Sequence, residues 1–191
     1  AVVNIDNVLS KVDTQLSART AAEYASEYTK IDLSDMDVIY DIKADSPVIA
    51  GPSAGAAMTI ATIAALQNLS LRKDTVITGT INDDGTIGLI GGVLAKATAA
   101  KESNMSIFLV PATQSSEIIY KEERICRSTA GFQYCKINYL PERIDIGKEV
   151  DISVGTPPVS ELIKNELKLE KGSGVPNKDI KGNISVEQVI K

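Results

Sequence analysis

Apolar residues recur at helical spacing near the start of the chain. From about Asp6 to Lys30 they form one stripe, which predicts an amphipathic helix. The stripe consists of Leu9, Val12, Leu16, Ala21, Tyr24, Ala25 and Tyr28. Residues 53–68 are apolar on most helical faces, as is typical of a buried helix. A third helix is expected from about Val93 to Ser103.

Shorter patterns predict strands between these helices. Residues Met36 to Ile42 alternate between apolar and polar positions, which indicates a half-buried strand. Residues 75–80 are rich in β-branched side chains. The turn residues of 82–85 and the return over 86–90 then predict a β-hairpin. Residues 107–110 form a short apolar run that ends at Pro111, which indicates a buried strand.

The pattern is weaker beyond Thr113. It favours a helix from there to Arg124, a hairpin around Gly131, and another helix over residues 159–169 after two prolines. From residue 171 onward Gly, Pro, Asn and Lys dominate, which predicts a linker or flexible tail. Taken together, the elements predict an α+β fold in one domain.

Composition and charge exclude several functions. The net charge of −5, without any cluster of Lys and Arg, argues against a nucleic-acid partner. The chain contains no histidine. This excludes Ser-His-Asp and Cys-His mechanisms and every His-ligated metal site. Catalysis would have to use carboxylates, lysine, tyrosine or a hydroxyl, and we expect neither a metal nor a cofactor.

The longest nearly apolar run has 13 residues, Ala54 to Leu66, whereas a membrane-spanning helix needs about 20. We therefore expect no membrane span, and no signal-peptide pattern is present. Because the chain begins at Ala1 and not at a methionine, we expect a processed form or a piece of a longer protein. Cys126 and Cys135 are too few for a four-ligand zinc site. A turn at Gly131 would bring them within disulfide range, and two free thiols are the alternative.

A pentapeptide at Gly51 reads Gly-Pro-Ser-Ala-Gly. Pro52 fixes its own φ, the flanking glycines permit close backbone approach, and Ser53 would open the apolar helix with an exposed hydroxyl. The free amides of a first helical turn, near Ser53 and Ala54, would stabilise an oxyanion. The alternative is that Ser53 only caps the helix.

A lysine follows a double glycine later in the chain. Gly91 and Gly92 precede a helix in which Lys96 stands among Val, Leu, Ala and Thr. Burial would lower the pKa of the Lys96 amine, which is what a lysine general base requires. The alternative is an exposed lysine whose charged end reaches solvent.

Four ordered motifs now carry a family resemblance: the pentapeptide of Ser53, Thr78-Gly79, the double glycine with Lys96, and residues 107–111. Their order, and the 43 positions from serine to lysine, resemble the proteolytic domain of Lon proteases (family S16). The resemblance is continuous from about Leu16 to Pro111. It implies a fold like that of ribosomal protein S5 domain 2. The chain would then divide into a peptidase domain, residues 1–170, and the tail, residues 171–191.

The resemblance also implies roles for the site residues. Ser53 would be the nucleophile of a serine-type endopeptidase and Lys96 its general base, forming a Ser-Lys dyad, while Thr78 would help to orient the lysine amine. Peptide bonds would be cleaved through an acyl-enzyme intermediate. The predicted strand Met36 to Ile42 would pair with an extended polypeptide substrate.

The chain also departs from the family pattern. Ala50 stands where family members usually carry an acidic residue, and Thr80 follows Gly79 where an acid is common. Most of an N-terminal β-rich stretch is expected to be missing. The chain has no nucleotide-binding Gly-Lys-Ser/Thr motif, so an ATPase module would lie elsewhere in the full protein or be absent. Family rings of six suggest a homo-oligomer. Cytoplasmic and cell-surface locations both stay open, and the cysteine pair favours a stand-alone archaeal type at the cell surface.

Two other functions remain as alternatives. A non-catalytic binding or adaptor module could retain the same fold, as Ala50 would allow. The Gly51 pentapeptide could also hold a phosphate at a helix start, as in small-molecule kinases. A kinase would need carboxylates for Mg²⁺. Asp83 and Asp84 are poor candidates for that role because they lie in a predicted turn.

Overall fold

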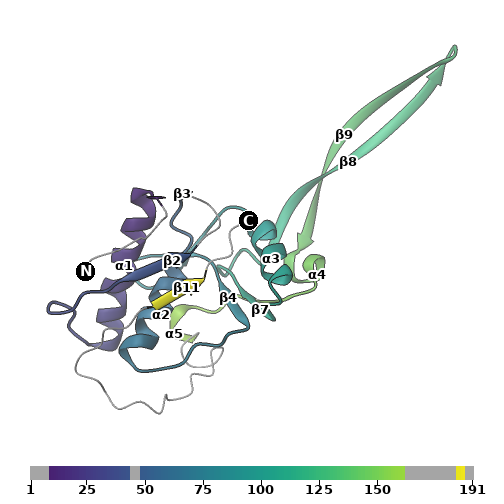
Figure 1. The fold of residues 1–191 in the computed structure, drawn as a ribbon. Helices are drawn as coiled ribbons and strands as arrows, with labels where there is room; N and C mark the ends of the chain where they lie inside the picture. Colours follow the sequence, from purple (N-terminus) through teal and green to yellow (C-terminus); the bar gives the residue numbers. More distant parts are fainter. Residues whose placement is uncertain (1–8, 44–47, 162–183, 188–191) are drawn as a thin grey trace.

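The computed structural model describes residues 9–43, 48–161 and 184–187 (Figure 1). The helices are α1 (Val12–Thr29), α2 (Gly55–Leu66), α3 (Val93–Glu102), α4 (Ile146–Val150) and α5 (Val159–Glu161). The strands up to the middle of the chain are β1 (Leu9–Ser10), β2 (Tyr40–Lys43), β3 (Val48–Ile49), β4 (Thr75–Ile77), β5 (Thr80–Ile81) and β6 (Ile87–Gly88). The later strands are β7 (Ile107–Leu109), β8 (Ser116–Thr129), β9 (Phe132–Asp145), β10 (Ser153–Gly155) and β11 (Ile184–Glu187).

A three-stranded parallel sheet, in the order β10-β7-β4, joins two hydrophobic clusters. The first cluster packs α1 and α2 around the fully buried Tyr40 and Met58. The second packs α3 and α4 around the buried Phe108 of β7. Helices and strands are thus mixed along the chain, as the α+β prediction stated. No helix in the described residues is long and apolar enough to span a bilayer.

Helix α1 confirms the predicted helix but buries a different face in its first half. Val12 and Leu16 are 69% and 56% exposed, whereas Ala18, Ala21 and Ala25 are buried. Small side chains allow α1 and α2 to approach closely. A Cβ on the first residue of α2, Gly55, would lie 2.5 Å from Ser17 Oγ, so only glycine fits there.

The segment expected as one strand of a hairpin divides into two. Residues 75–77 form β4 and pair in parallel with β7, while β5 pairs with β6 across the predicted turn. The division falls at Thr78 and Gly79, whose backbone amides donate to Leu109 O and Ser53 O, both over 2.9 Å. The predicted strand Met36 to Ile42 also starts later, at Tyr40.

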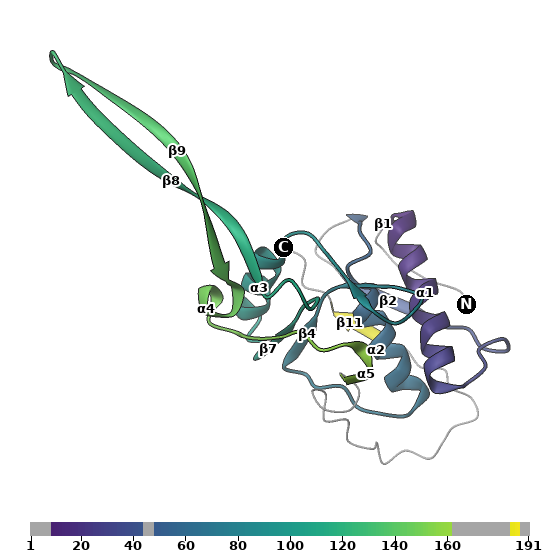
Figure 2. The same cartoon turned by 180° about the vertical axis from the view of Figure 1, so that it is seen from behind.

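The helix expected after Thr113 is wrong. Residues 116–145 instead form one long antiparallel ribbon, β8–β9, which projects from the body in both views (Figures 1 and 2). Ala130 and Gly131 make its two-residue turn, both with positive φ. Cys126 and Cys135 stand directly opposite each other and form a disulfide.

The last described elements fall near the predicted final helix and tail. Helix α5 covers only residues 159–161, and the remainder of the predicted helix, 162–169, lies outside the described residues. Within the segment predicted as a linker or tail, β11 forms a strand that pairs in parallel with β2. Strand β10 pairs with β7. The end of the chain therefore adds two strands to the body.

Candidate active site

Ser53 lies in the turn that leads into α2. The helix begins at Gly55 with Ala54 as its N-cap, and Gly51 has a φ of +97°, a value that favours glycine. The Ser53 hydroxyl, half-buried, has no hydrogen-bond partner among the described residues. The N-cap interpretation of Ser53 is therefore wrong, and its hydroxyl is not committed to capping the helix.

Helix α1 holds the turn before Ser53. Thr14 Oγ1 donates to Gly51 O, and Ser17 Oγ donates to Pro52 O, each over 3.1 Å. Gly51 N donates to Asp13 Oδ2 over 3.0 Å. Thr14 and Ser17 are buried for this reason. The sequence did not indicate them, because a hydroxyl that serves a distant turn leaves no periodic signal; two polar residues inside an otherwise apolar helix face are the one trace.

The carboxyl end of β4 holds the other side of the turn. Gly79 N donates to Ser53 O over 2.9 Å, and the buried Thr78 hydroxyl contacts the same oxygen over 3.4 Å. Ala56 N donates in turn to Gly79 O over 3.0 Å. The amides of Ser53 and Ala54 donate to no acceptor in the described part of the chain. Two amide donors thus remain beside the serine hydroxyl.

Lys96 lies one turn into α3, whose left-handed N-cap is Gly92 with a φ of +67°. Its amide donates to Gly92 O over 3.1 Å, which ties the lysine backbone to the double glycine. The side chain is half-buried, and this burial lowers the pKa of the Lys96 amine below its usual value. Hydrogen bonds join Thr78 to Ser53, but none between described residues joins Lys96 Nζ to either.

Two side chains that the sequence did not indicate fix the start of α3. Gln114 accepts from Ile90 N over 2.9 Å and donates to Ile90 O over 2.7 Å, directly before the double glycine. Glu117 Oε2 accepts from Leu94 N over 3.1 Å, in the first helical turn, where a carboxylate is favourable. Both residues follow β7, so the position of Lys96 depends on the segment that begins the ribbon.

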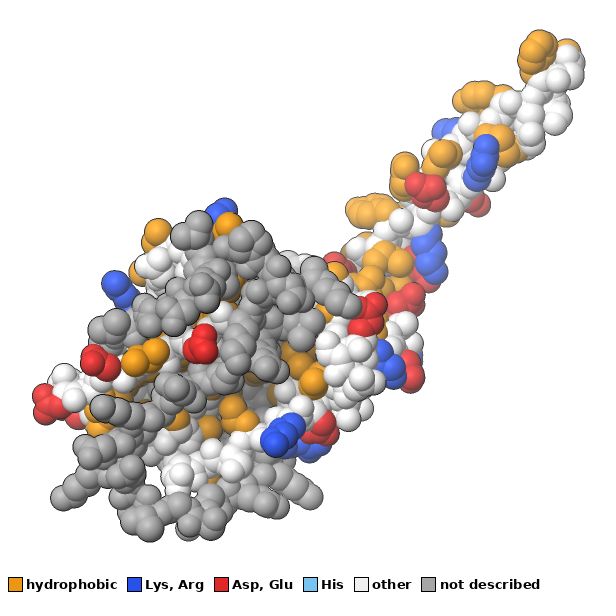
Figure 3. Space-filling model, in the orientation of Figure 1, with side chains coloured by type: hydrophobic (Ala, Val, Ile, Leu, Met, Phe, Trp, Pro, Cys, Tyr) orange, Lys and Arg blue, Asp and Glu red, His pale blue; other side chains and the backbone are white. Residues whose placement is uncertain are grey.

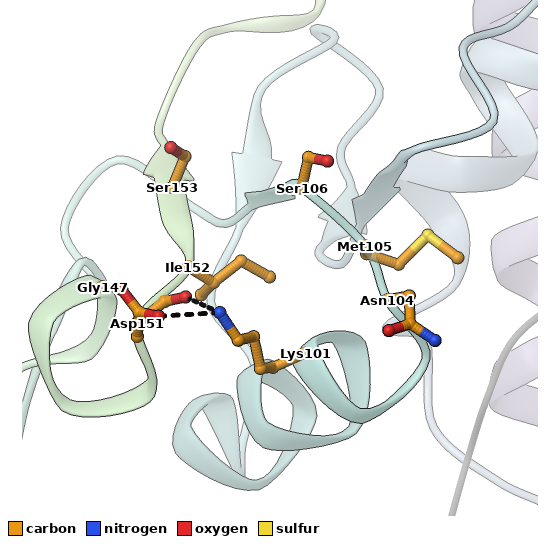
Figure 4. Close-up of a pocket in the computed structure, with 8 residues that line it drawn as sticks. All are labelled: Lys101, Asn104, Met105, Ser106, Gly147, Asp151, Ile152 and Ser153. Atoms are coloured by element: carbon orange, nitrogen blue, oxygen red, sulfur yellow. Dashed lines mark hydrogen bonds and ion pairs between the residues drawn. The ribbon is translucent and has the colours of Figure 1, made fainter.

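A pocket lies at the other end of the parallel sheet (Figure 4). Its lining includes Ser106 and Ser153, at the amino ends of β7 and β10, whereas Thr78 follows the carboxyl end of β4. Lys101 Nζ donates there to the backbone oxygen of Asp151 and lies 2.9 Å from its Oδ2. The two charged residues of this pocket are thus paired with each other, and its lining includes none of the residues of the serine site.

The acidic turn after β5 has a structural role. Asp84 Oδ1 accepts from the amide and the hydroxyl of Thr86, over 2.9 and 2.7 Å. These bonds close the turn and lower the pKa of the Asp84 carboxyl. Among the described residues, no group of three or more Cys, Asp or Glu side chains could hold a metal ion.

Comparison with known proteins links this site to one family. Residues 13–134 match the model of the Lon protease (S16) C-terminal proteolytic domain, which is more than half of the chain. An archaeal Lon protease of Thermoplasma volcanium is 28% identical over 127 residues, 66% of this chain and 17% of that protein. The archaeal Lon protease of Methanocaldococcus jannaschii is 27% identical over 156 residues, 78% of this chain and 23% of that protein.

The end of the chain is similar to a different protein. Residues 155–191 match the model of the ribosomal protein L11 RNA binding domain. Large ribosomal subunit protein uL11 of Pyrococcus horikoshii is 59% identical over 78 residues, 39% of this chain and 44% of that protein. The chain spans less than half the length of each of these relatives.

Proposed function

The chain belongs to the Lon protease (S16) family, and from this premise we propose that it hydrolyses peptide bonds with Ser53 as nucleophile and Lys96 as general base. One observation carries the proposal. Thr14, Ser17 and the backbone of Gly79 bind the three carbonyl oxygens of residues 51–53. The turn is thereby fixed, while the Ser53 hydroxyl stays without a partner among the described residues. A nucleophile needs such a rigid position and a free hydroxyl.

The reaction follows from these groups. Neutral Lys96 takes the proton of Ser53 Oγ as that oxygen attacks the substrate carbonyl, and the amides of Ser53 and Ala54 donate to the oxyanion. The Lys96 ammonium then protonates the leaving amine, which gives the acyl-enzyme. Lys96, neutral again, then deprotonates a water that attacks the acyl carbonyl, and the resulting ammonium returns this proton to Ser53 Oγ as the carboxylic acid product leaves. Burial supports this role because it lowers the pKa of the Lys96 amine and favours the neutral base.

Thr78 is a positioning residue in this proposal. Its hydroxyl proton is directed at Ser53 O, so the lone pairs of Thr78 Oγ1 are available to accept from the lysine amine. The substrate is proposed to be an extended polypeptide along β2. One edge of β2 is paired with β11, and the other has no strand partner in the described part of the chain.

The test is hydrolysis of casein or a fluorogenic peptide without ATP, by this chain and by its Ser53→Ala variant. Ser128→Ala, at an exposed ribbon position, is the matched control. We expect turnover in the parent and the control and none in Ser53→Ala, with the free energy of unfolding changed by less than about 0.5 kcal/mol. A fluorophosphonate probe should label Ser53, and labelling should disappear in Lys96→Ala. Turnover that persists in Ser53→Ala contradicts the proposal. Absence of both turnover and labelling favours a non-catalytic binding module.

The L11-like segment favours a second candidate function, contact with structured RNA. The support is its match to an RNA binding domain, a class of partner that the acidic composition argued against. Residues 155–191 contain six Lys and five acidic residues, so their charge adds little attraction to phosphate. Filter binding of the whole chain to a ribosomal RNA fragment, over a range of salt concentrations, tests this function. Retention no greater than that of an unrelated RNA hairpin would exclude it.

A further inference from the structure

The ribbon β8–β9 exposes most of its side chains although only its base is anchored. Ile144 is buried in the second hydrophobic cluster and Ile119 packs against it. Farther out, Tyr120 and Tyr134 are each 68% exposed and Phe132 is 81% exposed. Apolar side chains gather along the whole ribbon (Figure 3). A two-stranded ribbon is marginally stable alone in water, so such a surface indicates a partner.

The pairing register divides the ribbon into two different faces. Directly opposed residues share a face, so the Cys126–Cys135 disulfide lies on one side together with five apolar side chains. We call this side the disulfide face; its apolar members are Ile118, Tyr120, Ile137, Tyr139 and Pro141. On the opposite face every pair from Ile119–Glu142 to Arg127–Tyr134 contains a charged residue. The disulfide face also carries charges, but its pairs Tyr120–Pro141, Cys126–Cys135 and Ser128–Gln133 have none, so it is the face better suited to burial.

The charges on the disulfide face are complementary to themselves. Glu122 and Arg124 occupy neighbouring pairs, opposite Tyr139 and Ile137 respectively. If a second ribbon lies antiparallel on this face, with the twofold axis between the two pairs, Glu122 of each copy meets Arg124 of the other. Tyr139 then packs on Ile137 of the second copy. No other partner is required to neutralise these charges.

The distribution of charge along the chain also favours a second copy of this chain as the partner. The ribbon, residues 116–145, contains five acidic and five basic side chains, whereas the whole chain carries −5. The net negative charge therefore lies outside the ribbon, and two copies can meet along it without net repulsion. We propose that the disulfide faces of two copies pack antiparallel and form a twofold-symmetric dimer.

The area that the dimer would bury follows from the dimensions of the ribbon. Strands of 14 residues are about 48 Å long, and a ribbon about 10 Å wide then buries roughly 450 Å² per copy. This area is at the low end for specific interfaces, so we expect a weak, reversible dimer. The disulfide holds the outer part of the ribbon in register before the copies meet, which limits the ordering that association requires.

Sedimentation velocity of the whole chain from about 1 to 200 μM tests the dimer. Tyr120→Glu is the informative variant and Tyr134→Glu its matched control, since both tyrosines are 68% exposed and lie on opposite faces. We expect Tyr120→Glu to raise the dimer Kd at least tenfold and Tyr134→Glu to change it less than twofold. Because both sites are exposed, circular dichroism should show an unchanged fold.

A charge exchange provides the second arm. Glu122→Arg and Arg124→Glu should each weaken the dimer, and the double exchange should restore it, because the antiparallel contact is then rebuilt with the signs reversed. A chain that stays monomeric throughout the concentration range overturns the proposal. So does an equal effect of Tyr120→Glu and Tyr134→Glu, a double exchange no better than the single variants, or a larger assembly that is insensitive to Tyr120→Glu.

Discussion

Thr78 Oγ1 lies 3.4 Å from the carbonyl oxygen of Ser53, and the amide of the next residue, Gly79, donates to the same oxygen over 2.9 Å. The end of β4 and the start of α2 are thereby fixed to each other across 25 positions of sequence. The hydroxyl of Thr78 is buried, so the contact is shielded from water. This contact makes Thr78 a sensitive position for the proposed chemistry.

Replacing Thr78 with valine should reduce turnover without eliminating it. Valine keeps the shape but removes one hydrogen bond, which contributes about 1 kcal/mol, so kcat should fall by up to about tenfold. Thr78→Ser keeps the hydroxyl and should retain most of the activity. Steady-state kinetics of both variants check this expectation. Equal activity of the valine and serine variants would exclude a role for the hydroxyl.

Activity should rise with pH through the pKa of Lys96. Burial lowers the pKa of this amine, so the rise should occur below the ordinary lysine value of 10.5. Lys96→Arg should be as inactive as Lys96→Ala, since a guanidinium does not lose its proton in this range. The pH dependence of kcat/KM provides the measurement. A flat profile from pH 6 to 10, or activity in the arginine variant, would exclude Lys96 as the base.

The same shift predicts how stability depends on pH. The folded chain binds the Lys96 proton more weakly than the unfolded chain does, so stability should increase as pH rises from the folded pKa of Lys96 toward 10.5. Lys96→Met should remove this increase. Urea unfolding of both chains between pH 7 and 10 checks it, and parallel curves would contradict it.

Gln114→Ala should reduce activity although Gln114 is not one of the proposed catalytic residues. The change removes both hydrogen bonds to the backbone of Ile90, directly before the double glycine. We expect the free energy of unfolding to fall by about 1 to 2 kcal/mol. We also expect kcat to fall severalfold at unchanged KM, because Lys96 loses its fixed position. Gln133→Ala, at an exposed ribbon position, is the control. An unchanged kcat in Gln114→Ala would show that Gln114 is only structural.

The burial of Tyr40 should make the folded chain less stable at high pH. Burial raises the pKa of Tyr40 to about 12, although a hydrogen bond to Thr62 opposes the shift. Thr62 Oγ1 donates to Met58 O, so Tyr40 is the donor in its 2.7 Å contact with Thr62. The unfolded chain loses this proton near pH 10, so stability should fall by on the order of 2 to 3 kcal/mol between pH 10 and 12.

Tyr40→Phe provides the comparison for that prediction. The variant should have a free energy of unfolding about 1 kcal/mol lower at pH 8, because one hydrogen bond is lost. Above pH 10 its free energy of unfolding should fall less steeply with pH than that of the parent chain. Denaturant unfolding at pH 8 and pH 11 measures both effects. The same pH dependence in parent and variant would show that Tyr40 is not the responsible group.

Local sequence patterns predicted the elements whose own residues are mostly apolar and are therefore buried. Helix α2 is apolar on most faces, and β7 is a short apolar run closed by a proline; both formed where expected. The ribbon did not, because period-two alternation arises only where one face is buried, and both faces of β8–β9 carry apolar and polar side chains. Its Ile and Glu residues after Ser115 therefore resembled a helix with a solvated face.

The sequence by itself determined the residue types and the spacing of the serine, threonine and lysine motifs, and with them the family, because such motifs are contiguous in the chain. Only the tertiary structure decided what holds them. Thr14 and Ser17 reach the turn before Ser53 across 37 and 35 positions, and Gln114 reaches Ile90 across 24. Hydrogen bonds between distant segments leave no periodic trace in a sequence. They follow from packing, which brings a hydroxyl or an amide to a backbone group that would otherwise be buried without a partner.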